Sequence, residues 1–486
     1  MSVHWPIIRR CFSRPAATAV IDDQRRWSRL EILAAAFMLA DEIDARAAGP
    51  TVGFLLPTSG LAPVAALATW ITGRTVVPLN YLLKREELEY VLADCGCNLV
   101  ITARPMLDFM GYRPAGPDLF ELESLQKAVP SPRWPAFTAG SDLAVLLYTS
   151  GTSGRPKGVM LSHDNLSANI RQCTAWASLG PDDLVVGVLP QFHSFGLTVL
   201  TLLPLTVGFP AVFTARFVPG KIVRLFRQHR PSLFIGIPSM FNALLHAKDA
   251  HADDFSRCKY VVSGGEPLPQ AVFDGFRDRF GVTINEGYGL TETSPVTNWC
   301  RPDEFRRGSV GRPLPGVRQR IVSIETGHEL PPHEDGEIRT AGPNLMQGYF
   351  RRPQDSAAAL DEQGFLRTGD IGRTDTDGHL YITGRLKEML IIGGENVFPR
   401  EIEEVLNAHP AVKDSGVIGR TDPVRGEEPV AFVELKEGAT LTETDARAFC
   451  RQRLAGYKVP AAVRVVDALP RNSTGKVLRR ELKNLL

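Results

Sequence analysis

The chain has 486 residues, a formal net charge of +1, and 44% hydrophobic against 22% charged residues. At roughly 100–200 residues per domain, this length predicts about two to four domains with substantial cores. The even charge balance lacks the basic excess of a nucleic-acid-binding protein, so we expect no nucleic-acid partner. Seven cysteines without a repeating spacing argue against a disulfide framework and favour a reducing, cytoplasmic location.

The N-terminal residues do not form a signal peptide, because they contain arginines and no long apolar run. Residues 47–73 and 196–215 are uncharged and long enough to raise the question of a membrane span. Prolines, threonines and glycines interrupt both stretches, which favours buried helix–strand units instead. We therefore expect no transmembrane span, whereas peripheral membrane contact stays open.

Short apolar runs alternate with helical patterns through the first 280 residues. Residues 28–31 form a capping-box pattern, Ser28 to Glu31, that predicts the start of a helix. Alternating strands and helices predict parallel sheets covered by helices, an α/β fold. The predicted strands are 18–21, 52–56, 75–78, 99–102, 143–148, 185–189, 233–237 and 260–262, and the predicted helices are 28–47, 63–72, 86–93, 221–229, 239–246 and 270–280.

The sequence pattern changes in the second half of the chain. Between about 308 and 384 the strands become short and turn signals become dense, which predicts a β-rich part of a large N-terminal domain, residues 1–385. Residues 386–486 have an α+β pattern of their own and are long enough for a small C-terminal domain. Within this tail we predict helices at 399–407 and 443–454 and strands at 416–418, 430–435 and 463–466.

The most informative stretch is residues 148–159, which follows an apolar strand. Glycines allow tight turns, hydroxyls and backbone amides can donate hydrogen bonds, and Lys157 supplies a cation, as a polyphosphate requires. The spacing is not that of a Walker A loop, and residues 287–292 lack the third glycine of a dinucleotide fingerprint. Nucleophile-elbow and zinc-protease motifs are missing from the sequence. A flexible Ser/Gly surface loop is the alternative interpretation.

Six motifs in order give the chain a resemblance to the adenylate-forming superfamily, which includes acyl-CoA synthetases, adenylation domains of peptide synthetases and luciferases. The likeness spans nearly the whole chain. It implies the activation of a carboxylic acid by ATP and transfer of the acyl group to a thiol. The motifs are residues 148–159, 192–196, 287–293, 367–370, 384–387 with 392–396, and 470–476.

The resemblance implies roles around the phosphates and the metal. Thr291 would bind the α-phosphate, and Lys476 would offset negative charge as the carboxylate attacks. Mg²⁺ would be held by Glu292 with Thr149, since this hard cation prefers oxygen ligands. The group implied for the β- and γ-phosphates is Thr149, Ser150, Gly151, Thr152 and Lys157.

The nucleoside has its own implied residues. Tyr288 would lie against the adenine, while Asp370 and Arg385 would lie at the ribose. Taken together, the residues implied for this part of ATP are Gly264, Gly265, Glu266, Tyr288, Gly289, Asp370 and Arg385.

The C-terminal domain would rotate between two half-reactions, as it does in the family that the chain resembles. Lys387 matches the hinge position of that family. Lys476 would serve adenylation, and the loop containing Gly393 and Gly394 would then face the site and let the pantetheine arm of coenzyme A pass.

The segment 192–195 with His193 borders the acyl pocket in the family, and His193 is a candidate catalytic residue. No acidic residue stands out there to meet a substrate amine, which favours a non-amino acid. The segment 189–198 resembles fatty-acid-activating members, so we expect a medium- or long-chain fatty acid. An acyl carrier protein as thiol partner, and a non-catalytic nucleotide-binding protein, are the alternatives. Pocket candidates are Phe195, Gly236, Met240, Gly264, Gly289 and Val296.

Overall fold

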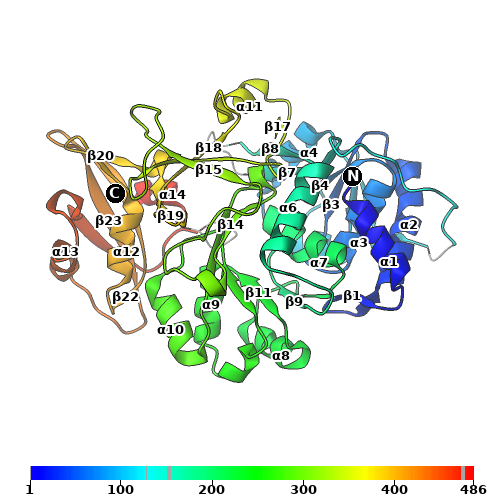
Figure 1. The fold of residues 1–486 in the computed structure, drawn as a ribbon, viewed down its shortest axis with the longest axis horizontal. Helices are drawn as coiled ribbons and strands as arrows, with labels where there is room; N and C mark the ends of the chain where they lie inside the picture. Colours follow the sequence, from blue (N-terminus) through cyan, green and yellow to red (C-terminus); the bar gives the residue numbers. More distant parts are fainter. Residues whose placement is uncertain (1, 127–128, 150–154, 472–476) are drawn as a thin grey trace.

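The computed structural model describes residues 2–126, 129–149, 155–471 and 477–486 (Figure 1). Three sheets belong to the first 385 residues and a fourth to the remainder. The fourth sheet lies at one end of the long axis and the N-terminus lies toward the other (Figure 1). The α/β class predicted from the sequence is confirmed.

One sheet has seven strands, in the order β17-β8-β7-β4-β3-β5-β6. Its central strands are parallel, whereas β8 runs antiparallel to both β7 and β17. The strands are β3 (Thr51–Leu55), β4 (Thr75–Pro78), β5 (Leu99–Thr102), β6 (Asp118–Glu121), β7 (Leu143–Thr149), β8 (Lys157–Ser162) and β17 (Gly348–Tyr349). Helices of this region are α1 (His4–Ser13), α2 (Arg29–Arg46), α3 (Leu61–Ile71), α4 (Arg85–Cys95), α5 (Arg104–Met110) and α6 (His163–Trp176).

A second sheet has eight strands, in the order β14-β13-β12-β11-β9-β10-β1-β2. From β13 to β1 all neighbours are parallel, so their carboxyl ends share one edge. The strands are β1 (Thr18–Ile21), β2 (Arg26–Ser28), β9 (Val185–Gly187), β10 (Ala211–Phe213), β11 (Leu233–Gly236), β12 (Tyr260–Ser263), β13 (Asn285–Gly289) and β14 (Val296–Trp299). Its helices are α8 (Pro219–His229), α9 (Pro238–Leu245) and α10 (Gln270–Phe280).

The β-rich stretch forms a four-stranded antiparallel sheet, β15-β16-β18-β19. Its strands are β15 (Arg318–Val322), β16 (Gly336–Ala341), β18 (Leu366–Thr374) and β19 (Leu380–Arg385), with α11 (Pro353–Ala359) inserted before β18. The last sheet contains β20 (Leu390–Ile392), β21 (Glu395–Val397), β22 (Val412–Asp422), β23 (Gly426–Leu435) and β24 (Ala462–Val466), with α12 (Pro399–Asn407), α13 (Glu443–Arg451) and α14 (Arg479–Leu482).

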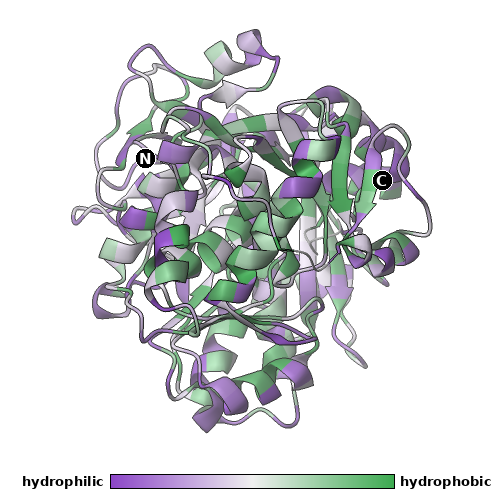
Figure 2. Cartoon of the chain, turned by 90° about the vertical axis from the view of Figure 1, so that its right-hand side faces the viewer, coloured by the Kyte–Doolittle hydropathy of each residue, from purple (hydrophilic) through white to green (hydrophobic). Residues whose placement is uncertain are grey.

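Both uncharged stretches are largely buried, as the sequence predicts. Helix α3 is buried at nearly every position, and the π-helix η2 (Phe195–Leu202) continues into the buried helix α7 (Leu203–Val207). In Figure 2 the helices in the middle of the view are largely coloured as hydrophobic, whereas hydrophilic segments lie mostly toward the outline. Among the described residues, no helix is both long and apolar enough to cross a bilayer.

Short 3₁₀ turns join the larger elements. They are η1 (Leu122–Ser124), η3 (Ala252–Phe255), η4 (Thr291–Thr293), η5 (Pro302–Glu304), η6 (Leu386–Glu388), η7 (Gly456–Lys458) and η8 (Lys483–Leu485). Of these, η4 and η6 hold candidate site residues.

Candidate nucleotide and acyl site

The candidate site begins at the carboxyl ends of β11, β12 and β13, the edge where open α/β sheets bind ligands. Gly265 follows β12 with φ of +82°, in the left-handed region that favours glycine. A Cβ on Gly289 would overlap the carbonyl oxygen of Pro295. Glycine is therefore favoured by the backbone conformation at position 265 and required by the close approach of the Pro295 backbone at position 289.

Asp370, on β18 of the β-rich sheet, contacts both Tyr288 on β13 and Arg385 on β19. Its hydroxyl donates to Asp370 Oδ2 at 2.8 Å, and Arg385 Nε lies 2.8 Å from Asp370 Oδ1. Asp370 and Tyr288 are buried, 3% and 9% exposed, while Arg385 is half-buried. Burial and the neighbouring carboxylate raise the pKa of Tyr288, so the phenol stays protonated as the donor. Three residues predicted at the nucleoside are thus one hydrogen-bonded group.

A second group surrounds Lys157 and Glu292. The Tyr349 hydroxyl donates to Glu292 Oε1 at 2.9 Å, and the Lys157 ammonium lies 5.3 Å from the centroid of the Tyr349 ring. Lys157 Nζ also pairs with Asp355 Oδ2 at 3.0 Å. Thr149 lies opposite Lys157 across the β7–β8 pairing. A cation and a carboxylate from distant parts of the sequence therefore lie on two sides of one phenol.

Burial and Glu292 raise the pKa of Tyr349, so this phenol also remains a donor. Glu292 is the middle residue of η4, and its carbonyl accepts from the Met346 amide at 2.8 Å. Because β17 pairs with β8, one segment braces both Glu292 and the strand that begins at Lys157.

Thr291 and His193 belong to a third group. The Thr291 and Ser194 hydroxyl oxygens are 3.4 Å apart, which brings η4 to the start of η2. Burial lowers the pKa of His193 to about 4, so its imidazole is neutral near pH 7. Its Nε2 is buried and has no hydrogen-bond partner among the described residues. A buried ring nitrogen of this kind can serve a bound ligand.

The residues predicted to border an acyl pocket are apolar. A Cβ on Gly264 would lie 3.0 Å from Phe195 Cε1, so the ring already fills that space. Phe195, Ile237 and Met240 are partly buried against the main core, and Val296 belongs to that core. Gly236, at the end of β11, leaves ordinary van der Waals room beside Met240.

Other predicted residues lie elsewhere. Lys387 is exposed in η6, directly after β19. Gly393 and Gly394 join β20 to β21 with φ of +62° and +89°, and a Cβ on either would meet no atom within 4 Å. The structure thus leaves this hairpin open to solvent. Glu266 is half-buried after Gly265. Ser150, Gly151, Thr152 and Lys476 lie outside the described residues.

Tyr349, Asp355 and Ser194 contribute to the site and were not predicted. Ser194 lies inside a motif, but its serine carried no separate signal. Tyr349 and Asp355 belong to none of the six motifs. They contact Lys157 because β17 pairs with β8, which begins at Lys157.

The residues present fit a magnesium ion shared with phosphates. The described residues hold no group of three or more His, Cys, Asp or Glu side chains that could enclose a metal. Glu292 offers a carboxylate that shares Tyr349 as a contact with Lys157, and Mg²⁺ is usually held by one or two carboxylates together with substrate phosphates.

Comparison with known proteins identifies the class. Residues 8–350 match the family model described as AMP-binding enzyme, and residues 401–476 match the AMP-binding enzyme C-terminal domain. Fold and site together define an adenylate-forming enzyme. The chain belongs to the AMP-binding enzyme family, in the acyl-CoA synthetase branch of the adenylate-forming superfamily, and is an AMP-forming acid–thiol ligase.

Similar proteins carry different substrate names. A long-chain-fatty-acid–CoA ligase of Bacillus subtilis is 35% identical, covering 89% of this chain and 85% of the relative. A feruloyl-CoA synthase of an Amycolatopsis species is 33% identical over 99% and 98%. A sulfoacetate–CoA ligase of Cupriavidus necator is 36% identical over 90% and 87%.

Solved structures share the whole architecture. ATP-bound MatB from Rhodopseudomonas palustris superimposes with a TM-score of 0.91 at 32% identity, covering 100% of this chain and 99% of that chain. The apo form of the same protein, at the same identity and coverage, gives a TM-score of 0.81. MenE from Bacillus subtilis with ATP and magnesium gives 0.88 at 29% identity, with 98% and 99% covered.

Proposed function

We propose that the chain activates a medium- or long-chain fatty acid with ATP and transfers the acyl group to coenzyme A. The observation that carries this proposal is the uncharged acyl side, formed by Phe195, Gly264 and Met240 beside the polar nucleotide groups. An apolar chain matches this lining, whereas a sulfonate or an amine would need a charged partner.

In the first half-reaction, a carboxylate oxygen attacks the α-phosphorus and pyrophosphate leaves. Thr149 ends β7 and Lys157 begins β8, so these two residues flank the predicted phosphate loop. This supports the assignment of the β- and γ-phosphates to the loop. Thr291 would bind the α-phosphate, and Glu292 would hold Mg²⁺, which screens the charge of the departing pyrophosphate. Asp370, already oriented by Tyr288 and Arg385, would accept from the ribose hydroxyls.

In the second half-reaction, the thiol attacks the acyl carbon and AMP leaves. His193, neutral and with an unpartnered Nε2, would lie beside the reacting acyl group. We place the domain boundary at residues 385 and 386, with the hinge at Lys387, because η6 separates β19 from the last sheet. The hairpin with Gly393 and Gly394 would turn toward the site only after the C-terminal domain has rotated about this hinge.

The better superposition on ATP-bound than on apo MatB supports an arrangement suited to the first half-reaction. Lys476 would then offset charge during adenylation. We expect Lys476→Ala to abolish adenylation while thioester formation from supplied acyl-adenylate is largely retained. Both half-reactions are measured separately, and equal losses in the two would remove this role.

The identity of the acid substrate is tested by measuring ATP–pyrophosphate exchange with a panel of fatty, aromatic, sulfonated and dicarboxylic acids. We expect exchange that rises with alkyl chain length and depends on added acid. Preference for an aromatic or a sulfonated acid would refute the fatty-acid assignment. Thioester formation is then measured with coenzyme A and with a holo acyl carrier protein, and we expect coenzyme A to be the better acceptor.

A further inference from the structure

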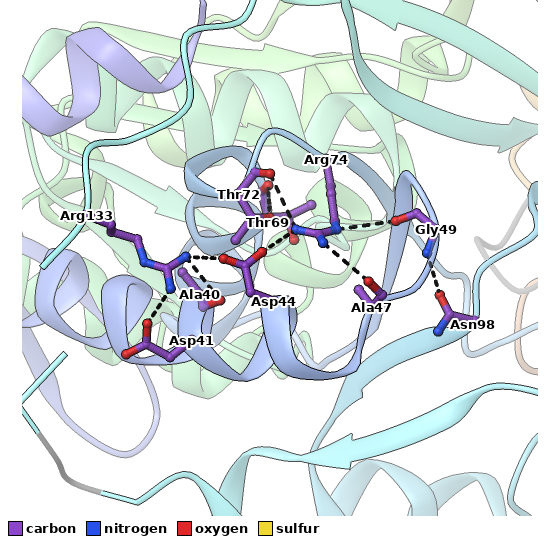
Figure 3. Close-up of polar contacts among 10 residues, drawn as sticks. All are labelled: Ala40, Asp41, Asp44, Ala47, Gly49, Thr69, Thr72, Arg74, Asn98 and Arg133. Carbon is purple, nitrogen blue, oxygen red and sulfur yellow. Dashed lines mark hydrogen bonds and ion pairs between the residues drawn. The ribbon is translucent and has the colours of Figure 1, made fainter. Parts of the chain in front are cut away.

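Residues 129–138 cross the outer surface of the N-terminal region and are anchored to it at several points. Arg133 pairs with Asp41 and Asp44 of α2, the latter through Nη1 at 2.5 Å. Arg74 binds Asp44 from the other side at 2.6 Å, so both carboxylates are neutralised (Figure 3). Further along, the Ala136 amide donates to the Ile71 carbonyl at 3.0 Å. The segment therefore has a defined position.

Despite these anchors, its large apolar side chains point outward. Val129 is 94% exposed, and Trp134 and Phe137 are each 80% exposed. The Phe137 ring lies 5.4 Å from the ring of Trp5 on α1. Phe12, 67% exposed, is two turns beyond Trp5 on the same side of that helix. Exposed apolar side chains gathered in this way mark an interaction surface.

Three arginines on α1 or directly after it are close in sequence to Phe12. Arg9, Arg10 and Arg14 are exposed, and none makes an ion pair within the part of the chain that the structure describes. Arg9 and Arg10 line a groove of about 330 Å³ together with Pro6, Ser13 and Thr206. The Ser13 hydroxyl donates to the Arg10 carbonyl at 3.1 Å, and Arg10 Nε donates to the Thr206 carbonyl at 3.3 Å. The remaining guanidinium N–H groups of Arg9 and Arg10 are suitable partners for a phosphate.

We propose that this surface docks on an anionic phospholipid bilayer. Aromatic rings suit the interfacial zone of a membrane, and each arginine near an anionic surface adds attraction. Lipid phosphates would enter the groove between Arg9 and Arg10. The N-terminal aromatic face, as we name it, consists of Trp5, Phe12, Trp134 and Phe137 with Arg9, Arg10 and Arg14.

Charge and position favour lipid over protein partners. In a symmetric contact between two copies, the arginines of both copies would enter one interface, and these like charges would repel. An acidic carrier protein would bind far from the moving domain, because the sheet of that domain lies at the opposite end of the long axis (Figure 1). Figure 2 looks onto the side with α1, where hydrophilic and hydrophobic segments alternate.

Vesicle co-sedimentation tests the proposal, without ATP, acid or thiol, so that its outcome is independent of the proposed function. We expect binding to phosphatidylcholine vesicles containing about 30 mol% phosphatidylglycerol, weaker binding to pure phosphatidylcholine, and loss of binding at about 0.5 M NaCl. Replacing Arg9, Arg10 and Arg14 by Gln together should lower the partition coefficient about a hundredfold. Trp134→Ser with Phe137→Ser should lower it at least about tenfold.

Matched controls lie outside this face. Val424→Ser removes an apolar side chain that is 90% exposed, and Arg257→Gln removes an exposed arginine. Both should bind vesicles as the wild type does, and circular dichroism should show all variants folded. The proposal is overturned if the folded wild type does not bind anionic vesicles. It is also overturned if the control variants lose as much binding as the test variants. It is likewise overturned if light scattering finds a dimer that Trp134→Ser with Phe137→Ser dissociates while vesicle binding is unchanged.

Discussion

Asp370 is buried and holds its position through two partners, the Tyr288 hydroxyl and Arg385. Tyr288→Phe keeps the aromatic ring and removes only the donor. A buried carboxylate that loses a hydrogen bond is destabilised by about 1–3 kcal/mol, so we expect the KM for ATP to rise about tenfold with a smaller change in kcat. Steady-state kinetics measure both. Tyr381→Phe, which deletes a hydroxyl–Asp375 contact in the same sheet, is the control and should leave KM unchanged.

The ion pair of Lys157 predicts a variant with a lower KM for ATP. Its ammonium pairs with the partly exposed Asp355, a carboxylate that would compete with the phosphates of ATP. Exposed ion pairs contribute about 0.2–1 kcal/mol, so Asp355→Asn should lower the KM for ATP by up to about fivefold. Asp335→Asn, which breaks the Arg373 pair, is the control. An increase in KM would mean that Asp355 positions Lys157 for the nucleotide.

At the scale of single elements, η6 connects the β-rich sheet to the last sheet. Proline at position 387 restricts the backbone rotation that a hinge requires. We expect Lys387→Pro to block thioester formation while ATP–pyrophosphate exchange is largely retained, with Lys387→Ala as the control. Unaltered overall turnover of the proline variant would remove Lys387 from the hinge.

Local signals explain which elements could be predicted. The Ser28–Glu31 capping box predicted α2, and the structure contains it. Helix α6 was missed although Ser162 and Asn165 form an equivalent box, because asparagine is a weaker signal than glutamate at that position. Helix α11 has no buried residue and therefore no apolar periodicity to detect. The predicted β-rich character of its surroundings otherwise agrees with the four-stranded sheet.

The site could be predicted only in part for a related reason. Motifs indicated Tyr288, Asp370 and Arg385 separately, whereas the hydrogen bonds between them depend on how β13 meets β18 and β19. The contacts of Tyr349 with Glu292 and Lys157 depend on pairing between β17 and β8, which are far apart in the sequence. Sequence patterns identify residue types, and tertiary pairing decides which of them meet.

For the whole molecule, buried histidines predict sensitivity to acid. Burial lowers the pKa of His4 and of His163 to about 4, against an ordinary value of 6.5. Because the folded pKa is the lower one, their contribution to stability is complete above about pH 6.5 and is lost as the pH falls toward 4. The His4 ring lies 5.7 Å from that of His163 and also lowers the pKa of His163, so the two effects overlap. Together they would lower the free energy of unfolding by at least about 3 kcal/mol over that range.

Chemical denaturation at pH 7.5, 6.5 and 5.5 measures this loss. His4→Phe removes one titrating group, so the variant should lose less stability than the wild type between the higher and the lowest pH. Identical pH dependence of the two proteins would show that His4 does not contribute. Carboxylates such as Asp361, whose pKa is lowered to about 2, titrate below this window.

The distance between the segment 129–138 and the last sheet has a practical consequence. A protein tethered by its N-terminal end to a bead, a sensor chip or a lipid film would keep the opposite end in free solvent. If the C-terminal residues rotate about Lys387 as proposed, densely immobilised molecules should then retain their turnover, whereas tethering through the last sheet would obstruct that rotation. The point of attachment would thus decide whether the immobilised enzyme is active.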